Sequence, residues 1–408
     1  MAPSGQQHTS QSTGAAPAVP PPAPARGWLA VIAVALGVFT VTATETMPIG
    51  LLPDMATDLK VSEGTVGLTV TLYGLFAGLL APVLTAASRG LDRRHLLLVI
   101  LTVFVLGNVL TAMAVSHVWL MVVRLLIGFI HGVLWAIVAS IAVGLVPPAL
   151  SVRATAVVFS GISLATVVGV PLGTIVGQWL DWRAAFWALA ACSAVALTAT
   201  AVLMPSMPPH GGVHLSELPR LLKAGNLRTA VSVTAIVVIG HYAAYTYITP
   251  FLLRDVGVPS NRIGVLLLCF GAAGVVGNFI AGAVIGRGPA LRSVVLAFVA
   301  GTGGSMALLL AVGDWKPAAI VLLLSWGLTY SALPVALQTL VLRSVPHARE
   351  AATSLYVLSF NVSISLGALC GSLALDRSGP SLVMITGMVF CAAALVVATF
   401  LRPEPTAP

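Results

Sequence analysis

The chain has 408 residues, of which 58% are hydrophobic and only 8% are charged, and its mean hydropathy is +1.02. This composition excludes a soluble globular protein of this size and indicates that lipid surrounds most of the chain. The net charge of +8 does not indicate nucleic-acid binding, because the basic residues stand singly or in pairs between apolar runs.

The N-terminal segment is rich in Pro, Ala, Ser and Gln, and its one charge is Arg26. Such a segment cannot bury enough apolar surface to fold, so residues 1–26 are predicted to form a disordered cytoplasmic arm. No cleavable signal peptide is expected, because the first apolar run is too long for a signal-peptide core and further apolar runs follow it.

Apolar runs of about 20 residues, the length of helix that crosses about 30 Å of hydrocarbon, recur along the rest of the chain. The first six are 28–53, 65–87, 96–115, 118–146, 154–178 and 184–204. The second six are 229–253, 263–286, 293–312, 317–342, 351–375 and 379–401. The sequence therefore predicts an all-α polytopic membrane protein with twelve transmembrane helices.

Two six-helix bundles are expected, over residues 27–204 and 229–402, with a C-terminal tail at 403–408. The cytoplasmic linker between them, 205–228, contains a short amphipathic pattern from His214 to Lys223 that suits the membrane interface. Similar halves joined by one longer loop are typical of transporters that bind substrate between the halves near mid-membrane. Any large polytopic protein can be divided in two, so the division alone does not establish transport.

The loop cations predict the orientation of the chain. With the N-terminus in the cytoplasm, thirteen Lys and Arg residues fall inside and six outside, and Arg124 lies within a span. This bias favours a cytoplasmic location for both termini.

Glu45 is an acidic residue inside the first predicted span. A charge in the membrane costs at least about 2.5–3.5 kcal/mol, so this side chain should face protein or a water-filled cavity. Burial in a low dielectric favours the uncharged carboxyl, as a proton carrier working near neutral pH requires. The alternative is a structural carboxylate near the outer headgroups.

The fourth predicted span carries Arg124, Gly128, His131 and Trp135 at spacings of 4, 3 and 4, which places them on one stripe of a helix. Arg124 is expected to hold the Glu45 carboxylate ionised until a proton or substrate displaces it. A fixed ion pair that only joins two helices is the alternative for Arg124, and hydrogen-bonded packing is the alternative to a proton relay for His131.

Aromatic and polar residues recur along two spans of the second half, where they suit a cavity for organic molecules or, alternatively, simple packing. His241, Tyr242, Tyr245 and Thr249 share one face of the seventh span, and Trp326, Tyr330, Pro334 and Gln338 step by four along the tenth. The substrate cavity is predicted to comprise Tyr73, Trp135, His241, Tyr242, Tyr245, Trp326, Tyr330, Gln338 and Asn361.

The four cysteines, Cys192, Cys269, Cys370 and Cys391, all lie in apolar stretches and are interpreted as packing residues. The sequence has no His/Asp/Glu metal cluster, no paired acids within the spans and no Ser/His arrangement on facing helices, so an enzyme is not expected. A channel is disfavoured because no re-entrant filter or ring of charges is present.

These residues resemble a known family, the drug:proton antiporter branch of the major facilitator superfamily, and especially bacterial sugar and nucleoside efflux permeases. The resemblance extends from residue 27 to about 402. The segment from Glu45 to Leu59 resembles the acidic first-helix segment of the family, and Arg124-Leu-Leu-Ile-Gly-Phe-Ile-His-Gly132 resembles the motif in which an arginine is implicated in proton transfer.

The fifth span, with Gly169, Pro171 and Gly173, is similar to the antiporter motif that lets this helix bend, although Thr174 replaces its last glycine. In the loop between the second and third spans, only Arg93 and Arg94 match the superfamily motif, and Arg89 stands where an aspartate is usual.

The resemblance implies a monomeric antiporter of the bacterial inner membrane that exports a small organic compound by alternating access. The proton gradient would drive it without a cofactor, with Glu45 as the proton carrier, Arg124 adjusting its proton affinity and His131 beside them. A proton-coupled importer or facilitator of sugars or nucleosides is an alternative within transport, and a non-transporting membrane sensor is an alternative from a different class.

Overall fold

The computed structural model describes residues 25–87, 90–208, 223, 225–287, 291–312, 315–345 and 349–401. These residues are helical apart from short connections. The N-terminal arm to residue 24, the tail from residue 402 and most of the amphipathic pattern expected from His214 to Lys223 lie outside the described residues.

Within the described residues, twelve stretches of helix are long and apolar enough to cross a membrane, which confirms the predicted number of spans. The first six are α1 (Ala25–Leu59), α2 (Glu63–Ala87), α3 (Arg93–Ala112), α4 (His117–Gly144), the composite of α5 (Ser151–Leu164), η2 (Ala165–Gly169) and α6 (Val170–Trp179), and α7 (Trp182–Leu203). A short 3₁₀ turn, η1 (Pro148–Leu150), precedes α5.

The second half follows the same plan. Its spans are α9 (Gly225–Tyr245) with α10 (Ile248–Arg254), then α11 (Ser260–Gly286), α12 (Leu291–Val312), α13 (Lys316–Ser344), α14 (Arg349–Ser378) and α15 (Pro380–Ala398).

Side-chain caps begin several of the helices. Asp92 accepts hydrogen bonds from two amides of the first turn of α3, Ser116 accepts from Trp119 N at 3.3 Å, and Asp181 accepts from Ala184 N at 2.8 Å. These caps satisfy amide groups that have no partner within the helix, and they sharpen the loop-to-helix boundaries.

Two spans are interrupted where proline removes a backbone donor. The fifth span widens into the π turn η2 directly before Pro171, whose ring and missing N–H disturb the preceding turn. The seventh span breaks at Thr246 and Tyr247, a few residues before Pro250. The apolar pattern predicted both spans as continuous, because hydropathy does not register the hydrogen bond that a proline removes.

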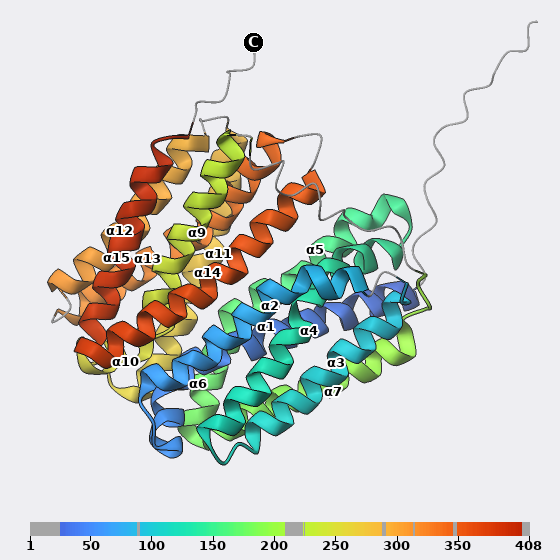
Figure 1. The fold of residues 1–408 in the computed structure, drawn as a ribbon, viewed down its shortest axis with the longest axis horizontal. Coiled ribbons are helices and arrows are strands. Elements are labelled where there is room, and N and C mark those ends of the chain that lie inside the picture. The colour runs from blue at the N-terminus through green and yellow to red at the C-terminus, as the bar shows by residue number, and fades with distance from the viewer. Residues whose placement is uncertain are drawn as a thin grey trace, which may run out of the picture.

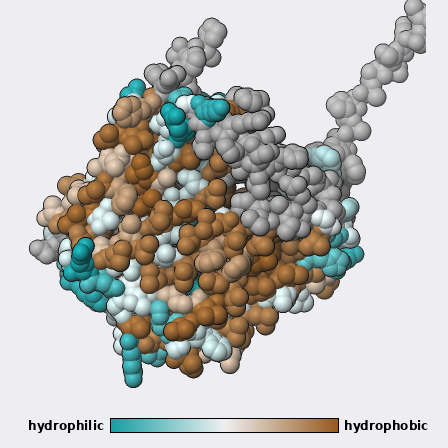
Figure 2. Space-filling model, viewed as in Figure 1, coloured by the Kyte–Doolittle hydropathy of each residue, from teal (hydrophilic) through white to brown (hydrophobic). Residues whose placement is uncertain are grey.

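Figure 1 shows two groups of helices, α1–α7 and α9–α15, with α2 and α14 side by side where the groups meet. Helix α11 also packs on η2 and α6, and α10 packs on α1. The visible surface is mostly hydrophobic, with hydrophilic residues towards the ends of the helices (Figure 2). Such a surface suits contact with lipid along the helices and with water at their ends.

The two halves are joined at one end of the molecule, which we call the far end because it lies opposite the described beginning of α1 and end of α15. Arg254 and Glu63 form an ion pair across the halves at 2.6 Å. Ser62 Oγ donates to Asp376 Oδ2 at 3.0 Å, and Ser372 Oγ donates to the Gly64 carbonyl at 2.8 Å. The protein is therefore closed at the far end.

Candidate functional site: a buried polar cluster in the first half

Helix α1 passes through Pro48 and Pro53 without ending. A proline has no N–H to donate to the carbonyl four residues earlier, so the carbonyls of Thr44 and Ile49 lose their normal partners. Both are satisfied from outside the helix. Arg124 Nη1 donates to Thr44 O at 2.6 Å, and Thr249 Oγ1 donates to Ile49 O at 3.3 Å across the two halves.

Arg124 lies on α4, and its side chain is almost completely buried, with 1% exposed. Its guanidinium carbon is 6.0 Å from the ring centre of Tyr73 and 5.2 Å from that of Phe186, within reach of cation–π attraction. The predicted ion pair with Glu45 is not formed among the described residues, because Arg124 donates to the proline-freed carbonyl of Thr44 instead. Its Nε and Nη2 atoms have no hydrogen-bond partner.

Glu45 lies one residue after Thr44 and is also buried, with 8% exposed. Its Oε2 atom is 3.6 Å from Nε2 of His131, and its Oε1 atom has no hydrogen-bond partner. An unpartnered carboxyl oxygen in a buried position is costly when charged and less costly when a proton neutralises it. The position therefore favours a group that gains and loses a proton.

His131 is fully buried and bonded at both ring nitrogens. The indole Nε1 of Trp135 donates to His131 Nε2 at 2.7 Å, and His131 Nδ1 lies 2.6 Å from the hydroxyl of Tyr73. An indole N–H only donates, so Nε2 is the acceptor nitrogen and the neutral ring carries its hydrogen on Nδ1. His131 is thereby held as one defined tautomer.

Gly128 brings α4 against α2 at this site. A Cβ atom placed there would lie 2.6 Å from the carbonyl oxygen of Tyr73, too close for any other residue. The predicted stripe of α4 thus faces the bundle interior, and its Arg124 and His131 both contact Tyr73.

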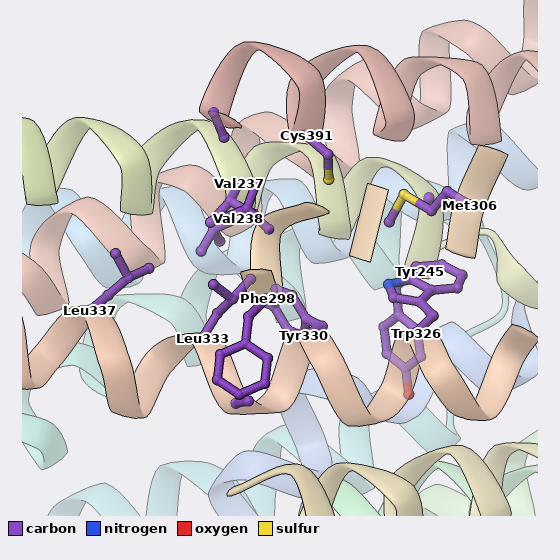
Figure 3. Close-up of a cluster of buried hydrophobic side chains, with 14 of the residues drawn as sticks. Val237, Val238, Tyr245, Phe298, Met306, Trp326, Tyr330, Leu333, Leu337 and Cys391 are labelled. Atoms are coloured by element: carbon purple, nitrogen blue, oxygen red, sulfur yellow. The ribbon is translucent and has the colours of Figure 1, made fainter. Parts of the chain in front are cut away.

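A second buried cluster lies in the other half, between α9, α11 and α13. The ring of His241 stacks on Tyr330 with centroids 3.2 Å apart and on Tyr245 at 5.0 Å, while Trp326 Nε1 donates to His241 Nδ1 at 3.1 Å. Figure 3 shows Tyr245, Trp326 and Tyr330 among the surrounding apolar side chains. Phe270 of α11 also belongs to this cluster, and its ring stacks on Tyr245 with centroids 5.0 Å apart.

Tyr242 of α9 packs edge-on against His241 and also lies within electrostatic range of the Glu45 carboxyl in the first half. Two predicted cavity residues are not drawn into either cluster. Gln338 is exposed, and the amide of Asn361 donates to Val357 O of its own helix at 2.9 Å.

The glycines of the fifth span allow close packing within the first half. A Cβ on Gly169 would lie 3.2 Å from that of Ala43, and one on Gly173 would overlap the sulfur of Met47. On the other side of this span, a Cβ on Gly271 of α11 would lie 2.8 Å from the Cα of Val167 in η2. The π turn before Pro171 is therefore held between α1 and α11.

Arg94, predicted as part of a conformational motif, contacts its own half in this structure. Its Nη2 atom donates to Ala201 O at 2.7 Å, near the carbonyl end of α7, where a positive charge is favourable. The backbone N–H of Arg93 donates to Met207 O at 2.9 Å.

Asp92, directly before Arg93, links the start of α3 to the segment after α7. Its carboxylate accepts hydrogen bonds from the Ser206 hydroxyl and the Met207 amide. Partial desolvation raises the pKa of Asp92, but the hydrogen bonds to its carboxylate outweigh desolvation and hold the pKa below its usual range. Arg89 lies outside the described residues.

The sequence model of the Major Facilitator Superfamily matches residues 34–368 and again 230–408. The chain belongs to the Major Facilitator Superfamily. Its members are transporters rather than enzymes, so this protein is a multi-pass membrane transporter with a small-molecule substrate, as the sequence predicted.

Solved structures of other transporters share the fold of this major facilitator protein. The crystal structure of the nucleoside transporter NupG matches with a TM-score of 0.75 at 12% identity, over 91% of this chain and 99% of that one. A bacterial homologue of the human lysosomal transporter Spinster, inward-facing and unoccupied, matches with a TM-score of 0.67 at 15% identity, over 93% of this chain and 95% of that one. At these identities, the likeness shows the fold alone.

Sequence reasoning missed the roles of Thr44, Phe186 and Phe270. The signal for Thr44 was present, because Pro48 four residues later frees its carbonyl. Phe186 and Phe270 carried no signal, since a single phenylalanine in an apolar run is indistinguishable from lipid-facing residues. Within the described ranges, no group of three His, Cys, Asp or Glu side chains could hold a metal ion.

Proposed function

We propose that this major facilitator transporter is a proton-coupled antiporter that exports a small organic compound such as a drug, a sugar or a nucleoside. The observation that carries the proposal is the buried Glu45 carboxyl, which has one unpartnered oxygen and a histidine nitrogen 3.6 Å from the other. A buried carboxyl that makes no direct ion pair with the arginine beside it is suited to proton uptake and release.

In this proposal the first half carries out proton binding and the second half binds the substrate. Glu45, Arg124 and His131 in the first half carry the proton chemistry. The aromatic rings of Tyr245, Trp326 and Tyr330 line the substrate cavity, where apolar contact and sparse hydrogen bonds bind a ring-bearing organic molecule. Proton and substrate then meet between the halves, where Tyr242 comes within electrostatic range of Glu45.

The closure of the far end supports alternating access in this proposal. With both termini in the cytoplasm of a bacterial cell, the far end faces outwards, and the ion pair of Arg254 with Glu63 closes the cavity to the exterior. Export then requires this pair to separate while the linker end closes. The fifth span, with Gly169, Pro171 and Gly173 packed against α1, is the element proposed to bend. The transporter acts as a monomer.

A proton-coupled importer of nucleosides or sugars is the second candidate. It is favoured by the likeness to a structure whose protein is described as a nucleoside transporter. The same Glu45 carboxyl would serve symport, so only the direction of coupled flow separates the two candidates.

The test uses purified protein in proteoliposomes to which antibiotics, sugars and nucleosides are added in turn while proton release is recorded. Antiport predicts a substrate-induced proton signal and, under an imposed proton gradient, substrate accumulation in the direction opposite to proton flow. Symport predicts that substrate and protons move in the same direction. Glu45→Gln should abolish the proton signal and gradient-driven transport while leaving substrate exchange without a gradient.

The matched control is Asp181→Asn, the same change at the start of α7, where Asn also caps a helix. This variant should retain the proton signal. A full signal in Glu45→Gln would remove Glu45 from the mechanism, and its loss in both variants would show general damage.

A further inference from the structure

The Nε2 atom of His131 lies between two side chains that compete for it. It accepts a hydrogen bond from the Trp135 indole at 2.7 Å, and Glu45 Oε2 lies 3.6 Å away without a hydrogen bond. A neutral imidazole has one acceptor nitrogen with one in-plane lone pair. The structure shows this lone pair occupied by Trp135.

Protonation of Glu45 changes this competition. An ionised carboxylate has no hydrogen to donate, so it cannot displace the indole from His131. A protonated carboxyl carries one O–H donor and needs an acceptor in its buried surroundings. Within the described surroundings, His131 Nε2 is the acceptor nitrogen adjacent to Glu45 Oε2, and it becomes accessible only when the indole leaves.

We propose that Trp135 is a positioning residue that controls proton loading of Glu45 by competing with its carboxyl O–H for the single lone pair of His131. The proposal rests on the proposed function in that Glu45 is the proton carrier. While Glu45 is charged, the indole occupies His131. When Glu45 takes up a proton from a hydronium ion, its O–H replaces the indole. The covalent changes are the O–H bond formed on Glu45 and the O–H bond broken in the hydronium, which leaves water.

The surrounding groups fit this exchange. The titratable and charged side chains that face the pair are Tyr73 from α2, Arg124 from α4 itself and Tyr242 from α9. Tyr73 holds the opposite nitrogen of His131 at 2.6 Å, so the ring stays in place while its second bond changes. The neighbours from α3 and α5, Phe104 and Phe159, do not titrate.

Release of the Trp135 indole from His131 would also alter a contact with the fifth span, the element proposed to bend. Trp135 is half-buried, and its ring centre lies 6.5 Å from that of Phe159 on α5. A rotation that takes the indole away from His131 changes this contact between α4 and α5. Proton loading at Glu45 is thereby linked by direct contact to the fifth span, which includes α5.

The other half contains a similar pair that lacks the acid. Trp326 Nε1 donates to His241 Nδ1 at 3.1 Å. Among the described residues, a carboxylate lies within 4 Å of a histidine nitrogen at His95, where it is Asp92, and at His131, where it is Glu45, but not at His241. The indole–imidazole bond is thus used in both halves, and of the two described pairs the one beside Glu45 has a carboxyl that can compete for the imidazole.

The experiment measures the protonation of Glu45 directly. Infrared spectra of purified protein are recorded against pH, and the carbonyl band of protonated Glu45 is identified as the band that is missing in Glu45→Gln. Trp135→Phe keeps an aromatic ring but removes the competing N–H. Its Glu45 band should persist to higher pH, with a midpoint raised by about one pH unit, a tenfold change in apparent proton affinity.

Trp119→Phe is the matched control, since it removes an indole N–H from the same helix that donates to Leu110 O at 2.8 Å on the exposed side. Its midpoint should equal that of the wild type. An unchanged midpoint in Trp135→Phe, or an equal shift in both variants, would overturn the inference. The infrared titration measures Glu45 protonation and does not require transport. A wild-type protein that shows the expected midpoints but no proton-coupled transport would therefore contradict the proposed function and not this inference.

Discussion

At the level of single residues, the site is built around backbone carbonyls that α1 leaves unpaired. An unsatisfied carbonyl in a membrane costs several kcal/mol, so a proline within a membrane helix needs a donor from elsewhere. Arg124 supplies that donor to Thr44 O at 2.6 Å. The arginine is therefore fixed beside Glu45 by Pro48, not by an ion pair.

This arrangement predicts energetic coupling between Arg124 and Pro48. Arg124→Leu should destabilise the protein by about 1–3 kcal/mol, because it leaves Thr44 O buried without a donor. Pro48→Ala restores the N–H of residue 48, so the same Arg124→Leu change should cost at least about 1 kcal/mol less in that background. Unfolding free energies in detergent for the single and double variants measure the coupling.

Pro53→Ala provides the control for this cycle. Pro53 frees the carbonyl of Ile49, which Thr249 satisfies from the other half, so Pro53→Ala and Arg124→Leu should be additive. Additivity for Pro48 as well would show that Arg124 does not replace the donor missing at this proline.

At the level of elements, the fifth span combines a π turn, a proline and glycines that fit against α1. The resemblance of Gly169, Pro171 and Gly173 to the antiporter motif implied that this span can bend. The structure adds where the irregular turn lies, at Ala165–Gly169, and that Gly271 of α11 packs against it from the other half. A π turn leaves some backbone groups without regular partners, which makes it easier to deform than a straight helix.

Gly173→Leu is expected to stop transport without preventing membrane insertion. A side chain at residue 173 would overlap the sulfur of Met47, which lies two residues after Glu45 on α1. It would therefore force α6 away from α1 close to the proposed proton site. Overpacking of this kind costs about 1–3 kcal/mol, which is less than the stability of most domains. Transport in proteoliposomes and the yield of folded protein measure the two effects separately.

Gly304→Leu is the control for this substitution, because a Cβ at residue 304 of α12 meets nothing within 4 Å. It should transport like the wild type. Normal transport by Gly173→Leu would mean that the contact between α1 and α6 is not needed during the cycle.

At the level of the whole molecule, the far end joins the two halves by exposed polar contacts and by a buried apolar cluster that includes Val66 of the first half and Tyr247 of the second. Arg254 and Glu63 pair at 2.6 Å, and a cleft lined by both residues, Lys60 and Asp376 lies beside them. The Arg254 side chain is 55% exposed, so this pair contributes only about 0.5–1 kcal/mol. Contacts of this strength can break and reform during a transport cycle.

Arg254→Ala should therefore shift the population about two- to fivefold towards a state that is open at the far end. Electron–electron distance measurements between spin labels at residues 60 and 261, in a background without the four native cysteines, would report the change. The longer distance should gain population in the variant.

Arg183→Ala is the matched control, because its ion pair with Asp58 at 2.7 Å lies within the first half. It should leave the distance distribution unchanged. Equal distributions for Arg254→Ala and wild type would mean that the pair between the halves does not bias the conformation.

Hydropathy and charge along the chain were sufficient to predict the fold class, the twelve spans and the residues that need a reason to lie in the membrane. Hydropathy and charge suffice for these because lipid imposes the same demand on every span. Glu45, Arg124 and His131 were identified in this way, and the spacing along α4 predicted a common face for Arg124, His131 and Trp135.

The partners of these residues became evident from the packing of the helices and not from the sequence. The pairing of Arg124 with Thr44 O, the bond from Trp135 to His131 and the exclusion of Gln338 from the aromatic cluster depend on how helices far apart in sequence are rotated and spaced. Hydrogen bonds are short-ranged and directional, so shifts of about 1 Å between helices select one partner over another. A one-dimensional pattern does not contain that information.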